Sequence, residues 1–158
     1  MKTNYLLPNK FKKIGWIIFV PSLIVGILWL IFKFEPNFLN VKVLSFFNDE
    51  LFKSLEFIVV VENNIIDEIL GVLIIISASF IAFAKEKNED EFISKLRLES
   101  LVWATYVNYA ILILALIFVY NMSFFWVMVF NMFTVLIFFI IRYNWALYKS
   151  KRDLSDEK

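Results

Sequence analysis

The 158-residue chain is 61% hydrophobic and 19% aromatic, with a mean hydropathy of +0.73, which lies far above the range of water-soluble domains. Its 16 basic and 15 acidic residues almost cancel, so the net charge of +1 predicts no nucleic-acid partner. Histidine and cysteine are both absent, which excludes thiolate nucleophiles, disulfides and histidine acid–base catalysis. We therefore expect an all-α integral membrane protein that is not an enzyme and holds no metal ion or cofactor.

Four windows of the sequence are apolar enough to cross a bilayer, which requires about 20 residues for about 30 Å of hydrocarbon. Since lipid offers no partner to backbone amides, each window is expected to be a helix. The first is too long for a signal peptide and lacks a small-residue cleavage site, so we interpret it as a retained anchor. The predicted fold is four transmembrane helices arranged as two antiparallel hairpins, with spans at 14–32, 65–84, 101–120 and 124–141.

Close packing between the first two spans is expected at small residues, because lipid tails compete for every larger apolar contact. Ser22 and Gly26 offer such positions in the first span. Gly71, Ala78 and Ala82 offer them in the second. These two spans are therefore predicted to be antiparallel neighbours.

Residues 33–64, between the first two spans, are expected to form a small extracytoplasmic cap. The segments VKVLSFF and LEFIVVV have the composition of strands and bracket the polar stretch NDELFKS, which favours a β-hairpin. Short interfacial helices over 41–62 are the alternative, because NDELFKSLEF also contains helix formers. In ENNIIDEIL the asparagines and the two acids are a helix start signal, and an ion site there is the less favoured interpretation.

The stretch KEKNEDEFISKLRLES, residues 85–100, is expected to be a cytoplasmic helical elbow that runs without a break into the third span. Asp90 and Arg97 lie seven residues apart on the helical stripe that continues to Ala104 and Asn108. An arginine facing the bundle needs a carboxylate, which Asp90, or alternatively Glu89 or Glu86, can supply. We predict a cytoplasmic polar cluster of Asp90, Arg97, Ser100 and Arg142.

Polar residues are few inside the last two spans. Because the chain reverses at Asn121, Met122 and Ser123, Asn108 is expected at about the depth of Thr134, with Asn131 one turn further out. Hydrogen bonds among these three side chains would stabilise the helix pair. Contact with a solute in a shared pathway is the alternative, although ionisable residues at mid-depth, which mark most transport paths, are absent.

The basic residues predict the orientation. With the N-terminus inside, all but three of the 16 Lys and Arg lie on the cytoplasmic side, the exceptions being Lys33, Lys42 and Lys53. The five tryptophans independently fall at span ends, where the headgroups lie: Trp16, Trp29, Trp103, Trp126 and Trp145. We therefore expect a multi-pass protein of the plasma (inner) membrane with both termini cytoplasmic, including the tail 142–158.

These patterns predict an accessory or regulatory membrane protein that docks a cytoplasmic or membrane partner, because the charged residues gather on one side. A second copy of the chain is one such partner, and the lipid bilayer is the solvent for all four spans. The alternative is a subunit of an oligomeric channel or small-solute transporter. The sequence identifies neither a ligand nor a partner.

Overall fold

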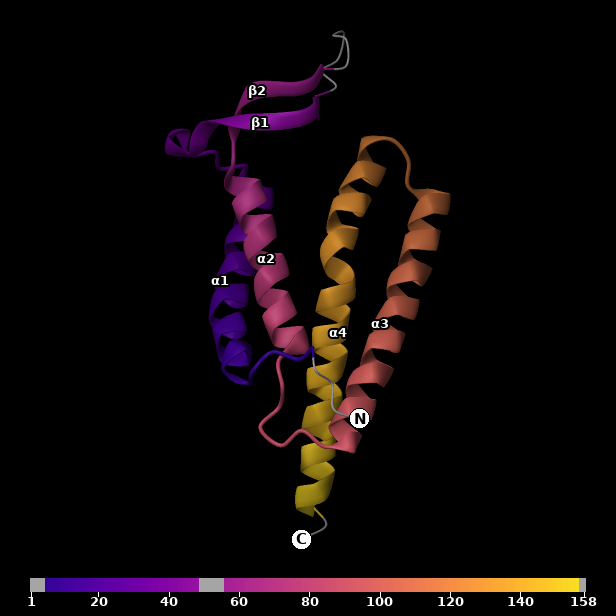
Figure 1. Ribbon diagram of the computed structural model, residues 1–158. Coiled ribbons are helices and arrows are strands. Elements are labelled where there is room, and N and C mark those ends of the chain that lie inside the picture. Colours follow the sequence, from indigo (N-terminus) through magenta and orange to yellow (C-terminus); the bar gives the residue numbers. More distant parts are fainter. Residues whose placement is uncertain (1–4, 49–55, 157–158) are drawn as a thin grey trace. The chain divides into compact units, whose positions relative to one another are not determined.

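The computed structural model describes residues 5–48 and 56–156, and these are mostly helical (Figure 1). Four of the helices are long and apolar enough to cross a membrane, which confirms that part of the predicted fold and indicates a multi-pass membrane protein. The chain divides into two compact units, one formed by Pro21–Leu73 and the other by Met1–Val20 together with Ile74–Lys158. The elements in chain order are α1 (Lys10–Phe32), the short 3₁₀ helix η1 (Asn37–Leu39), β1 (Asn40–Asn48), β2 (Glu56–Asn64), α2 (Ile66–Phe83), α3 (Glu91–Phe118) and α4 (Met122–Asp156).

The helices differ in length, and the two longest, α3 and α4, have charged ends. At about 1.5 Å per residue, the 18 residues of α2 extend about 27 Å, whereas the 28 of α3 and the 35 of α4 extend about 42 and 52 Å. The hydrocarbon of a bilayer is about 30 Å thick. The helices α3 and α4 are therefore longer than a span requires, and their charged ends are available for contacts outside the hydrocarbon.

The strands β1 and β2 pair antiparallel within the unit Pro21–Leu73, which confirms the β-hairpin interpretation over interfacial helices. Val43 lies opposite Val61, and Leu44 lies opposite Val60. Most of the NDELFKS stretch that was expected to form the turn lies outside the described residues. At the open end of the hairpin, the side-chain amide of Asn64 donates to Asn40 Oδ1 at 2.6 Å.

The start of α2 follows the capping pattern of the sequence. The side-chain oxygen of Asn64 accepts a hydrogen bond from the Ile66 amide at 3.3 Å, and Asp67 and Glu68 occupy the first turn. Asn63 Nδ2 donates to Glu68 Oε1 at 2.7 Å. Acids are favourable here because the first turn of a helix carries a partial positive charge.

In the other unit, α3 and α4 form an antiparallel hairpin (Figure 1). The chain reverses at Asn121, whose φ of 58° lies in the left-handed region that asparagine tolerates well. Ala104 and Asn108 are buried on α3. Phe139, Tyr143 and Leu147 are buried on α4 at intervals of four residues, so they form one face of that helix.

The helices α1 and α2 approach each other closely at Gly15. A Cβ added to Gly15 would lie 2.8 Å from Ile81 Cγ1 and 2.9 Å from the backbone oxygen of Ser77. Ser77 and Ile81 are themselves buried. The absence of a side chain at Gly15 therefore allows the two backbones to approach, as small residues do in membrane helix pairs.

The predicted continuous helix over 85–100 is corrected by the structure, in which α3 begins at Glu91. The carboxylate of Asp90 accepts a hydrogen bond from the Ile93 amide at 2.8 Å and caps the helix, a role for which aspartate is strongly preferred. Before it, the Lys85 amide donates to Leu7 O at 2.8 Å, and the Leu7 amide donates to Phe83 O at 2.9 Å. Because the backbone of Lys85 is bound to the N-terminal segment, it does not continue a helix.

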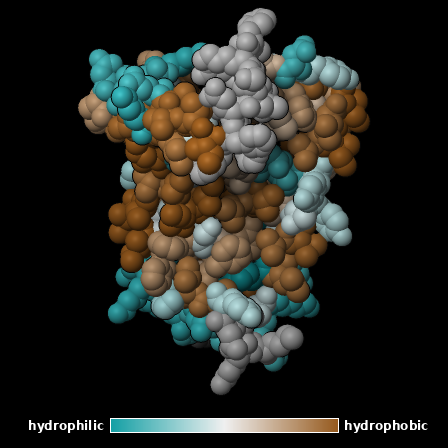
Figure 2. Space-filling model, turned by 45° about the horizontal axis from the view of Figure 1, so that its top comes forward, coloured by the Kyte–Doolittle hydropathy of each residue, from teal (hydrophilic) through white to brown (hydrophobic). Residues whose placement is uncertain are grey.

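Most of the large apolar side chains on the helices remain exposed in the isolated chain. On α3 they include Ile113, Leu116 and Phe118, which are 56%, 55% and 73% exposed. Figure 2 shows apolar side chains over much of the visible face. Surfaces of this composition are suited to contact with lipid.

Candidate functional site

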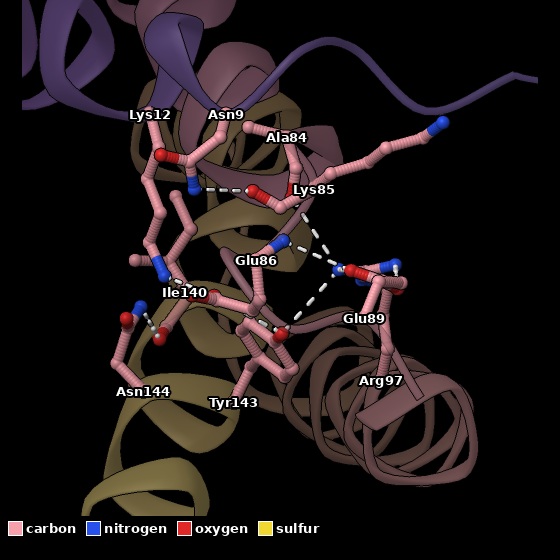
Figure 3. A network of polar contacts seen from close by, with 10 residues as sticks. All are labelled: Asn9, Lys12, Ala84, Lys85, Glu86, Glu89, Arg97, Ile140, Tyr143 and Asn144. Carbon is pink, nitrogen blue, oxygen red and sulfur yellow. Dashed lines mark hydrogen bonds and ion pairs between the residues drawn. The ribbon is translucent and has the colours of Figure 1, made fainter. Parts of the chain in front are cut away.

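A network of ionisable side chains links four segments of the unit that contains α3 and α4 (Figure 3). Lys12 comes from the first turn of α1, and Glu86 and Glu89 come from the irregular segment 85–90. Arg97 comes from α3, and Tyr143 comes from α4. We refer to these five residues as the polar network.

Arg97 and Glu89 form the central pair of the polar network. Arg97 Nη1 donates to Glu89 Oε1 at 2.7 Å, and Nη2 donates to Glu89 Oε2 at 3.3 Å. Their side chains are only 11% and 23% exposed. Two parallel bonds between a guanidinium and a carboxylate fix their relative orientation as well as their charge. Arg97 Nη2 also lies 3.3 Å from the backbone oxygen of Ala84, so the arginine binds the chain just after α2.

The hydroxyl of Tyr143 connects Arg97 to the second carboxylate, that of Glu86. The hydroxyl accepts from Arg97 Nη2 at 3.4 Å and donates to Glu86 Oε1 at 3.2 Å. Its ring lies beneath two cations, with Arg97 Cζ 5.4 Å and Lys12 Nζ 5.6 Å from the ring centroid. Tyr143 is 1% exposed, so both the hydroxyl and the ring face act in a largely dry environment.

Lys12 completes the polar network through an ion pair with Glu86. The network thus contains two cations and two carboxylates and is formally neutral. The amide of Glu86 donates to Glu89 Oε2 at 2.9 Å, which folds the segment 85–90 around the arginine. Removing one member of such a buried pair is strongly destabilising, because it leaves an uncompensated charge among these segments. Within residues 5–48 and 56–156, no group of three or more acids is placed to hold a metal ion.

One donor of the network, Arg97 Nε, has no partner within the described part of the chain. Arg97 Nε is buried and lacks a hydrogen-bond acceptor among the described residues. An unsatisfied buried donor is unfavourable, so it partly offsets the stabilisation from the two bonds to Glu89.

Of the four residues in the predicted cytoplasmic cluster, only Arg97 enters the polar network. Asp90 caps α3, because its extended backbone directs the carboxylate to the Ile93 amide and away from Arg97. The Ser100 hydroxyl donates to the backbone oxygen of Leu96 at 2.7 Å. Arg142 lies against the rings of two tryptophans. The predicted Asp90–Arg97 pairing is therefore replaced by Glu89–Arg97, the alternative acid one position earlier.

The sequence predicted no partner for two residues of the polar network, Lys12 and Tyr143. A signal for Tyr143 was present, because Phe139, Tyr143 and Leu147 repeat at intervals of four on one face of α4. Lys12 gave no comparable signal, since it is one of several lysines near the N-terminus.

The three polar residues predicted inside the last two spans lie together. Asn108 Oδ1 accepts from Thr134 Oγ1 at 2.6 Å and from Asn131 Nδ2 at 3.2 Å. Asn108 is 2% exposed. The acceptor on α3 is therefore used by two donors on α4, an arrangement that joins the helices.

Replacing Asn108 with leucine is expected to lower the free energy of unfolding by about 1–2 kcal/mol, because Thr134 and Asn131 lose their shared acceptor. The measurement is equilibrium unfolding of the purified protein in mixed micelles. Tyr109→Leu is the matched control, since Tyr109 is the next residue on α3 and is 56% exposed. Equal stability of the two variants would contradict the proposed role of these hydrogen bonds.

The fold is mostly helical, with four helices long and apolar enough to cross a membrane, which indicates a multi-pass membrane protein, and the linked charges lie at one end of the α3–α4 hairpin. Comparisons with protein-family models, with curated proteins and with solved structures find no match. The function of this chain is therefore inferred from its own geometry.

Proposed function

We propose that the protein is a non-enzymatic accessory or regulatory component of the plasma (inner) membrane, which it crosses four times with both termini in the cytoplasm. The excess of Lys and Arg on the side of the polar network supports this orientation. Its function is to dock a cytoplasmic or membrane partner through the first two turns of α3.

The observation that carries this proposal is a pair of large apolar side chains exposed among charged ones. Phe92 is 54% exposed and Leu98 is 62% exposed. They accompany exposed charges on the same turns, and we call the set the docking face: Glu91, Phe92, Lys95, Leu98 and Glu99. An apolar anchor surrounded by a polar rim is typical of protein interfaces.

The position of Phe92 argues against lipid as its only contact. Phe92 lies nine positions before Leu101, the start of the apolar run, which corresponds to about 13 Å along the helix. At that distance the ring lies outside the hydrocarbon, where the two exposed side chains of Phe92 and Leu98 together support a protein partner.

The polar network supports the same function because it acts just behind the docking face. Arg97 lies between Lys95 and Leu98 in sequence, and it is tied to the segment 85–90 and to α4. A face that is ordered before binding loses less conformational entropy when the partner arrives. The network thereby presents the docking face as a pre-organised surface.

The test is the double substitution Phe92→Ala with Leu98→Ala in the full chain. We expect recovery of the crosslinked partner from native membranes to fall at least about tenfold, because truncating an anchor residue typically costs more than 1 kcal/mol. The measurement is quantitative mass spectrometry after crosslinking and purification.

The matched control is Ile113→Ala with Leu116→Ala, two exposed residues within the apolar run of the same helix. An unchanged set and yield of crosslinked proteins in the docking-face variant would contradict the proposal. Deletion of 85–91 is unsuitable as a test, since it also removes Glu86 and Glu89 from the polar network.

The alternative, a channel or transporter subunit, has weaker support. A pathway would need polar groups free to meet a solute, whereas Asn108 already accepts from both Asn131 and Thr134. Flux through reconstituted vesicles, compared between the wild-type chain and Asn131→Leu, discriminates the two functions. A wild-type flux above background that the substitution changes would favour the pathway.

A further inference from the structure

Arg142 occupies an environment unlike that of Arg97. Its guanidinium carbon lies 5.6 Å from the ring centroid of Trp103 on α3 and 5.1 Å from that of Trp145 on α4. One turn further along α4, Lys149 Nζ lies 6.0 Å from the Trp145 ring. Two cations and two indole rings therefore gather between the charged ends of α3 and α4.

Neither cation of this group has an acidic partner among the side chains that the structure describes. Among the side chains of residues 5–45, 58–150 and 152, no carboxylate oxygen lies within 4.0 Å of Arg142 or Lys149. Glu99, one turn before Trp103, pairs with Lys95 instead. The guanidinium of Arg142 also makes no hydrogen bond within this described part of the chain. Its planar set of donors is thus available to a ligand that carries negative oxygens.

The depth of the group matches a lipid headgroup. Arg142 directly follows the apolar run that ends at Ile141, and Trp103 is the third residue of the run that starts at Leu101. The indoles are 42% and 56% exposed, as expected for tryptophans at a membrane interface. The phosphates of a bilayer lie at this level.

The contacts of the two indole rings favour an anionic headgroup over a zwitterionic one. An indole face attracts cations, and it would attract the ammonium group of a zwitterionic lipid if it were vacant. Here Trp103 and Trp145 already contact Arg142, and Trp145 contacts Lys149 as well. The positive charges of Arg142 and Lys149 therefore favour an anion as the ligand of this group.

We propose that Arg142, Lys149, Trp103 and Trp145 form a binding site for the phosphate of an anionic phospholipid in the leaflet at this end of α3 and α4. Arg142 binds the phosphate oxygens, Lys149 adds a second positive charge, and the two indoles hold the guanidinium in place. The site rests on the membrane placement proposed above, and it is separate from the docking face.

The test measures lipid binding to the purified full chain by native mass spectrometry, with phosphatidylglycerol and phosphatidylcholine of identical acyl chains as probes. The wild-type chain is expected to bind phosphatidylglycerol more tightly. Arg142→Gln with Lys149→Gln should weaken binding of phosphatidylglycerol roughly 30-fold, since each basic residue near the surface contributes about 1 kcal/mol. Lys149→Gln alone, on an exposed side chain, should weaken it about fivefold, and this variant provides the test if the double variant does not fold.

The control is Lys42→Gln with Lys87→Gln, which makes the same change in net charge at two exposed lysines elsewhere. Equal affinity of the wild-type chain for the two lipids would overturn the site, as would equal loss of affinity in the control and test variants. Either result would leave the docking face untouched, because the crosslinking experiment uses other residues. Failure of the chain to enter a bilayer would overturn both proposals.

Discussion

Replacing Arg97 with alanine is expected to lower the free energy of unfolding by about 3 kcal/mol, the lower end of the range for breaking a buried ion pair because Glu89 keeps some contact with solvent. The substitution leaves Glu89 without its guanidinium and Tyr143 without a donor to its hydroxyl. It also releases the backbone oxygen of Ala84. Equilibrium unfolding in mixed micelles measures the change.

Lys95→Ala is the matched control for this prediction. Lys95 lies two residues earlier on α3 and pairs with Glu99 at 3.9 Å, but the two side chains are 77% and 62% exposed. Exposed pairs contribute little, so the expected change is within about 0.5 kcal/mol. Similar stabilities for the two variants would mean that the polar network does not hold the segments together.

The helical part of the fold was predictable because each apolar window is long and uninterrupted. The turn between the last two predicted helices was well defined, because only Asn121, Met122 and Ser123 separate their apolar runs. The same spacing predicted that Asn108 and Thr134 lie at about the same depth. In the structure, Thr134 Oγ1 lies 2.6 Å from Asn108 Oδ1. Depth along antiparallel helices follows from counting residues at a constant rise.

The strands were harder to predict than the helices. The β-branched composition of 41–47 and 55–61 favoured strands, yet the residues between them also suit a helix. The antiparallel pairing of Val43 with Val61 and of Leu44 with Val60 decides between the two. Such pairing depends on contacts between residues distant in sequence, which local propensity does not encode.

The polar network was only partly predictable. The direction of Arg97 followed from helical periodicity, because the arginine shares a stripe with Ala104 and Asn108. The choice of Glu89 over Asp90 did not follow, since it depends on the helix beginning at Glu91. That beginning depends in turn on the backbone pairing of Leu7 with the segment after α2.

Gly15→Leu is expected to lower the free energy of unfolding by about 3 kcal/mol, the upper end of the range for overpacking. Even a bare Cβ would lie 2.9 Å from the backbone oxygen of Ser77, which cannot move away without displacing α2. Leucine also favours a helix by nearly 1 kcal/mol over glycine, so a net loss would have to come from the clash. The measurement is again equilibrium unfolding in mixed micelles. Val20→Leu is the control, because it enlarges a side chain of α1 that is 44% exposed.

The position of Gly15 allows a second test of this prediction, through the ion pair between Lys12 and Glu86. Lys12 lies three residues before Gly15 on α1, so a displacement of the helix should also move Lys12 away from Glu86. If so, Lys12→Met should destabilise the Gly15→Leu protein less than it destabilises the wild-type chain, because the ion pair is already broken. Additive effects of the two substitutions on the free energy of unfolding would show that the clash at Gly15 is relieved without displacing Lys12. Wild-type stability of Gly15→Leu would contradict the close approach of α1 and α2 altogether.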